Sequence, residues 1–141
     1  MAFFPDLSPY AYGHRDHPGV VHIGWLDGSH SFQKGTVDSR LVEQIKLLSK
    51  TPVELYRGRH LCELCVAPPD IKKTFMPHND RLIDPNCAWA RWAGQRSSNG
   101  EIRVSFGKVV FAAPILIAHY IEEHGYLPPP DFLAAIEATA C

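Results

Sequence analysis

The clearest strand signals along the chain are one continuous apolar run and one pair of segments flanking a turn. Residues 20–26 read Val-Val-His-Ile-Gly-Trp-Leu, which predicts a strand that ends at the Asp-Gly turn of residues 27–28. Residues 101–104 alternate between charged and apolar side chains, and residues 109–112 are apolar. Between them, residues 106–108 read Phe-Gly-Lys and can turn, so the two segments predict a β-hairpin.

A helical period is present between residues 39 and 49. Apolar residues recur there at intervals of three and four, and Asp38 stands where a helix N-cap is expected. The resulting buried stripe consists of Leu41, Val42, Ile45 and Leu48. Thr-Pro at residues 51–52 ends this helix, and the alternation over residues 53–56 predicts a short strand.

Two more helices are predicted near the end of the chain. Pro114 suits a first helical turn and Gly125 suits a helix stop, so we expect a helix from Pro114 to His124. Asp131 is expected to cap a last helix over residues 132–139.

The order of these elements predicts an α+β fold with a short sheet, a β-hairpin and about three helices. The length of 141 residues suits one domain, over residues 1–141. Residues 1–18 are rich in Pro, Tyr, Asp and Gly and predict an irregular N-terminal arm. Residues 66–99 contain repeated turn signals and predict a long surface excursion, in which Trp89 and Trp92 could form an aromatic contact surface.

Composition and charge narrow the class of protein. The formal charge is −1 with no Lys/Arg block, which argues against nucleic-acid binding. No apolar run approaches the roughly 20 residues of a membrane span. The first residues lack the basic region of a secretory signal, so we expect a cytoplasmic protein whose cysteines are reduced or metal-bound.

The strongest chemical signal is the pair Cys62-x2-Cys65. Two thiolates at this spacing can bind one soft Lewis acid, usually Zn²⁺, from a tight turn. Two more ligands must then come from elsewhere in the chain. His119 and His124, near the end of the predicted late helix, are the candidates for these positions. The sequence therefore predicts a small zinc-stapled domain.

A second ligand set stays open. On an ideal helix, His119 and His124 lie about 140° apart, so both reach one ion only if the last helical turn tightens or frays. His60 would face the same way as Cys62 in an extended chain. The alternative set is therefore His60, both cysteines and one of the two late histidines.

The sequence offers no residues that we assign as catalytic. His119-x4-His124 is not the His-Glu-x2-His motif of metalloproteases, and the His-x-Glu of zinc deaminases is absent from the sequence. Proline follows the second cysteine closely where a redox site needs a helix, which disfavours redox use. Glu122 and Glu123 beside the histidines are the only candidates for a base in a zinc hydrolase.

Several segments together resemble an uncharacterised bacterial family of small proteins, a domain of unknown function. The most specific of them are Arg57-Gly58-x-His60-x-Cys62-x2-Cys65 and the segment Ala113-Pro114-x-Leu116-Ile117-x-His119-Tyr120-Ile121-x2-His124. The others are Asp6-Leu7-Ser8-Pro9-Tyr10, Gly24-Trp25-Leu26-Asp27, Gly100-Glu101-Ile102-Arg103-Val104 and the Tyr126, Pro128, Pro129 and Phe132 positions. The resemblance implies a cytoplasmic bacterial protein and implies no particular activity.

Two functional classes follow from these observations. The first is a non-enzymatic protein-interaction module, of an immunity or regulatory type, in which four protein ligands hold a structural zinc ion. The second is a zinc-dependent hydrolase-like enzyme with an open coordination position. Four protein ligands without an adjacent cleft favour the first class, and three ligands beside a pocket favour the second.

Overall fold

A computed structural model gives the fold and describes residues 3–10, 19–53, 60–65, 97–98 and 100–139. For residues 60, 61 and 97 the description is of the backbone alone. The strand predicted over residues 53–56 is described only at Val53. The excursion predicted over residues 66–99, with Trp89 and Trp92, lies outside the described residues except for residues 97–98.

The described part of the chain contains three helices and a three-stranded mixed sheet, which confirms the α+β class. In chain order the elements are β1 (Val20–His22), α1 (Ser39–Leu48), β2 (His60–Leu61), β3 (Ser97–Ser98), β4 (Glu101–Phe106), β5 (Val109–Pro114), α4 (Ile117–His124) and α5 (Pro130–Thr139).

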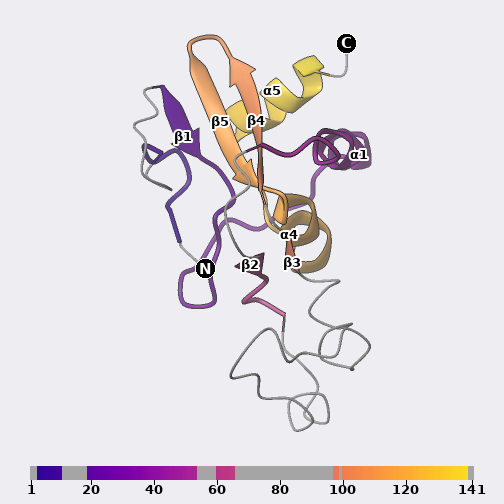
Figure 1. The fold of residues 1–141 in the computed structure, drawn as a ribbon. Helices are drawn as coiled ribbons and strands as arrows, with labels where there is room; N and C mark the ends of the chain where they lie inside the picture. The colour runs from indigo at the N-terminus through magenta and orange to yellow at the C-terminus, as the bar shows by residue number, and fades with distance from the viewer. Residues whose placement is uncertain (1–2, 11–18, 54–59, 66–96, 99, 140–141) are drawn as a thin grey trace, which may run out of the picture.

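The main sheet has the order β1-β5-β4 (Figure 1). β4 and β5 form the predicted antiparallel hairpin, turning through Gly107 at a φ of 64°. β1 adds to β5 in parallel, with Val20 opposite Val110. The short antiparallel pair of β2 and β3 lies near α4, away from the hairpin tip (Figure 1).

The described part of the predicted N-terminal arm, residues 3–10, runs along β1. The Tyr10 amide donates to the Val20 carbonyl at 2.9 Å, and the His22 amide donates to the Ser8 carbonyl at 2.9 Å. Tyr10 is buried against the sheet. These contacts cover the edge of β1 that faces away from β5.

β1 is shorter than the predicted strand over residues 20–26 because Gly24 bends the chain. Gly24 has a φ of 73°, in the left-handed region, and its amide donates to the Asp6 carboxylate at 2.9 Å. A Cβ at this position would lie 3.0 Å from the Ile117 side chain. Trp25 then pairs with Phe4 instead of extending the main sheet.

The helices cover the hairpin and close the core. α5 packs against α1 and β4, and α1 also contacts α4 (Figure 1). Asp38 caps α1 as predicted, accepting from the Arg40 amide at 2.9 Å. In the predicted stripe of α1, Val42 and Ile45 are buried, and Leu41 and Leu48 are half-buried. The largest fully buried core side chains include Trp25, Tyr120, Tyr126, Phe132, Ile23, Ile45, Ile117 and Ile136.

Two helix starts differ from the prediction. Pro114 is the last residue of β5, opposite Glu101, and α4 begins only at Ile117. Proline is tolerated here because it stands at the strand end, beyond the last β1 partner at Ala112. The last helix begins at Pro130, so Asp131 lies inside its first turn and is not the N-cap.

Within the described residues, no helix combines the length and the apolar character that crossing a bilayer requires.

Candidate metal centre

Cys62 and Cys65 lie in a tight turn that directly follows β2. The backbone amides of Leu64 and Cys65 hydrogen-bond to the Cys62 sulfur. Cys62 is 1% exposed and Cys65 is half-buried, and both are free thiols. Amides aimed at a sulfur favour its thiolate form, so the turn is built to support a negatively charged metal ligand.

His119 and His124 lie on α4, whose apolar side anchors it in the core. Ile117 and Tyr120 are fully buried, and Ile121 is 7% exposed. Gly125 ends the helix at a φ of 69°, as the sequence predicts.

The last turn of α4 is wider than a regular α-helical turn. The Gly125 amide donates to the Tyr120 carbonyl, five residues back, and the Tyr126 amide donates to the same carbonyl at 3.1 Å. A turn closed over five residues brings positions five apart toward one face. A tightened or frayed helix end was expected from the sequence, whereas the last turn of α4 widens and brings His119 and His124 together.

Four side chains from these two segments converge on one point. Their ligand atoms, two Sγ and two imidazole nitrogens, all lie within 4.8 Å of one another. Cys65 Sγ lies 3.2 Å from His119 Nε2 and 3.3 Å from His124 Nε2, and Cys62 Sγ lies 3.4 Å from His124 Nε2. The two imidazole rings meet edge to face with centroids 5.1 Å apart.

These separations fit a tetrahedral metal ion. Zinc–sulfur bonds of about 2.3 Å and zinc–nitrogen bonds of about 2.0–2.1 Å place ligand sulfur and nitrogen roughly 3.5 Å apart. The observed sulfur–nitrogen distances of 3.2–3.4 Å are close to that value. Cys62, Cys65, His119 and His124 therefore form a cluster that could hold a metal ion.

Burial shifts the protonation of the cluster. Burial raises the pKa of the Cys62 thiol to about 11, although the amides of Leu64 and Cys65 act in the opposite direction. Burial also lowers the pKa of His124, which keeps its imidazole neutral and able to coordinate. A metal ion bound at this position would have to displace the Cys62 proton and would then stabilise the thiolate.

Neighbouring segments hold both halves of the cluster in place. On α4, Glu122 Oε1 lies 2.8 Å from Lys46 Nζ, which ties the helix to α1. Gly28 packs against the cysteine turn, since a Cβ at Gly28 would lie 3.4 Å from the Glu63 carbonyl oxygen, at van der Waals distance. The role of Lys46 could not be predicted from the sequence, because Lys46 and Glu122 are 76 positions apart and no motif joins them.

The other predicted site residues are distributed as follows. His60 is in β2, where only its backbone is described, so the alternative ligand set stays untested. Glu122 and Glu123 are exposed and line a hollow of about 310 Å³ that His119 also borders. The two features that separate the functional classes, four converging ligands and a neighbouring hollow, are thus both present.

The fold and the cluster define the chain as an α+β protein with a Cys₂His₂ group that could hold a metal. A family model described as Domain of unknown function (DUF7919) matches residues 2–137, so the chain belongs to this family. The resemblance to a domain of unknown function is thereby confirmed. Comparisons with curated proteins and with solved structures give no match.

Proposed function

We propose that the protein binds one zinc ion through Cys62, Cys65, His119 and His124 and that this ion has a structural role. We further propose that the zinc-stapled domain is a cytoplasmic bacterial protein-interaction module of an immunity or regulatory type. The observation that carries the metal assignment is the convergence of four ligand atoms within 4.8 Å of one another. Two thiolates with two imidazoles are a ligand set typical of structural zinc sites.

A structural role is supported by the two distant segments that the cluster would join. The cysteine turn and α4 are more than 50 residues apart in sequence, and each contributes two of the four ligands. An ion bound to all four would close its coordination sphere and staple these segments together. Cys62 is only 1% exposed, so solvent has little access to that side of the centre.

A non-enzymatic role is supported by the ion pair that Glu122 forms with Lys46. Glu122 is one of the two candidate bases for a hydrolase, and its carboxylate is paired with Lys46 at 2.8 Å. This ion pair directs the Glu122 carboxylate toward α1.

The hydrolase-like alternative has one specific observation in its favour, the hollow of about 310 Å³ bordered by His119, Glu122 and Glu123. A catalytic centre needs an open coordination position beside such a hollow. If one histidine were not a ligand, water would take its place. The hollow is beside His119, so His119 is the histidine to remove. If His119 is not a ligand, His119→Ala should keep its zinc and its stability, and loss of both would assign His119 to the coordination sphere.

The test is metal analysis of purified protein together with three variants. We expect one zinc per chain in the wild type, and loss of zinc with a clearly lower Tm in Cys62→Ser and in His119→Ala. Structural zinc contributes several kcal/mol to folding, so its loss is readily measured. His30→Ala is the matched control, because His30 is an exposed histidine outside the cluster, and it should retain the metal. A wild type without stoichiometric zinc, or variants that melt like the wild type, would contradict the proposal.

A further inference from the structure

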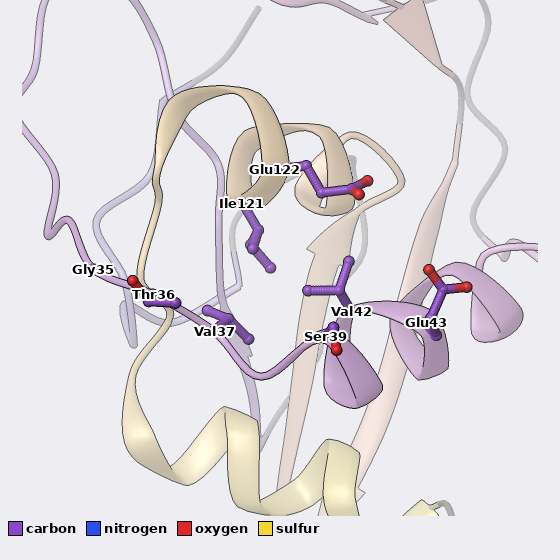
Figure 2. A pocket seen from close by; sticks show the side chains of 8 residues that line it. All are labelled: Gly35, Thr36, Val37, Ser39, Val42, Glu43, Ile121 and Glu122. Atoms are coloured by element: carbon purple, nitrogen blue, oxygen red, sulfur yellow. The ribbon is translucent and has the colours of Figure 1, made fainter.

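A second hollow lies between α4, α1 and the segment that precedes α1 (Figure 2). Its volume is about 290 Å³, at the lower end of the roughly 300–1,000 Å³ typical of ligand pockets. It therefore has room for a side chain or small fragment, and too little room for a nucleotide or large cofactor. The residues that line it are Gly35, Thr36, Val37, Ser39, Val42, Glu43, Ile121 and Glu122 (Figure 2).

The centre of this hollow is apolar. Figure 2 shows Val37, Val42 and Ile121 directed toward one another from three different segments. Val42 and Ile121 are only 6% and 7% exposed, so they form a fixed floor. An aliphatic side chain placed on this floor would remove further apolar surface from water.

One side of the hollow is acidic. Its lining contains two carboxylates, Glu43 and Glu122, and no cationic side chain. Lys46 is the nearby cation, 2.8 Å from Glu122 and 3.6 Å from Glu43. One ammonium group thus serves two carboxylates, and the Glu43 side chain remains 73% exposed. The amide end of α1, which would attract an anion, is already capped by Asp38.

We propose that this hollow docks a partner-protein segment that presents an aliphatic side chain beside a lysine or arginine. The aliphatic group would occupy the Val42–Ile121 floor, and the cation would approach Glu43. Charge complementarity selects this occupant over an acidic one. The inference rests on the proposed interaction role and gives that role a surface and a partner chemistry.

α4 links this docking surface to the metal centre. His119 and His124 reach the cysteine turn, whereas Ile121 and Glu122 line the hollow. An ion that fixes α4 would therefore also fix one wall of the docking surface.

The test is a titration of full-length protein with acetyl-Leu-Lys-amide, followed by proton–nitrogen correlation spectra. Acetyl-Leu-Glu-amide is the matched control that reverses the charge. Acetyl-Ser-Lys-amide is the matched control that removes the aliphatic side chain. We expect saturable shifts for the first peptide at residues 35–43 and 121–122, and clearly weaker binding of the other two. Glu43→Gln should weaken the first peptide about two- to fivefold, the range expected for one exposed charge pair. Glu123→Gln, on the same helix but outside the hollow, should leave binding unchanged.

Equal binding of all three peptides, shifts located elsewhere, or no binding would overturn the proposal. Chemical-shift changes at residues 35–43 that depend on protein concentration alone would assign the surface to a second copy of the chain. That outcome would also overturn the docking proposal. Zinc content measured on the same sample separates the two proposals. Zinc without peptide binding refutes only the docking surface, and peptide binding without zinc refutes only the structural metal.

Discussion

His22 is a titratable side chain enclosed by aromatic rings. It is fully buried, and its imidazole stacks on the Phe4 ring at 3.8 Å and on the Tyr10 ring at 4.8 Å, with Trp25 edge-on. This burial lowers the pKa of His22 from 6.5 to about 4. The native protein therefore keeps His22 neutral in a pH range where the unfolded chain protonates it.

The pH dependence of stability follows from this shift. Between pH 6.5 and pH 4 the unfolded state binds one more proton at His22 than the native state, so stability falls as pH falls through this window. The loss reaches about 3 kcal/mol near pH 4. His22→Phe keeps an aromatic ring but cannot titrate. Urea denaturation at several pH values should show the wild type losing about 3 kcal/mol relative to His22→Phe across the window, and a constant difference would contradict this.

At the residue scale, the sequence was most informative about the side chains that could bind a metal ion. The spacing of Cys62 and Cys65 and the recurrence of His119 and His124 predicted a cluster that the structure brings together. The burial of His22 could not be predicted, because it depends on Phe4 and Tyr10 in a segment without regular structure.

At the scale of elements, the C-terminal end of α4 controls the position of His124. Gly125 has a φ of 69°, and a Cβ there would meet no atom within 4 Å. Gly125→Ala therefore adds only backbone strain, which should lower the free energy of unfolding by about 1–2 kcal/mol. Because the strain falls next to His124, the variant should also bind zinc more weakly in competition with a chelator.

Gly107→Ala is the control for this effect. Gly107 has a φ of 64° in the β4–β5 turn and equally open surroundings. It should show a similar loss of stability with unchanged zinc affinity. Equal zinc affinity in both variants would show that the end of α4 does not position His124.

The hairpin and α1 were predictable because local signals determine them, namely a glycine turn flanked by strand residues and an Asp38 cap before a regular apolar stripe. The start of α4 was not, because Pro114 fits both a first helical turn and the end of a strand. Pro114 pairs with Glu101 across the hairpin, and this pairing makes it the last residue of β5 and not the first turn of α4. The widened last turn of α4 is likewise a property of tertiary packing around Tyr126, which is fully buried.

At the scale of the whole molecule, the proposed zinc ion would stabilise a region separate from the main sheet. β4 and β5 are held by a continuous ladder of six residue pairs. The cysteine turn and α4 meet through the cluster.

Removal of the proposed ion by a chelator should therefore loosen the cysteine turn and α4 more than it loosens β4 and β5. We expect amide hydrogen exchange to accelerate about tenfold or more in residues 62–65 and 117–124, with little change in β4 and β5. A uniform acceleration, or none, would contradict a local staple.

The central claim is that Cys62, Cys65, His119 and His124 together hold one zinc ion. X-ray absorption at the zinc edge tests it most directly, on the wild type and on the His119→Ala and His124→Ala variants, each mixed with one equivalent of zinc. We predict a first shell of two sulfurs at about 2.3 Å and two nitrogens at about 2.0–2.1 Å. A wild-type spectrum without two sulfurs and two imidazole rings, or a spectrum that stays unchanged in either variant, would contradict the account.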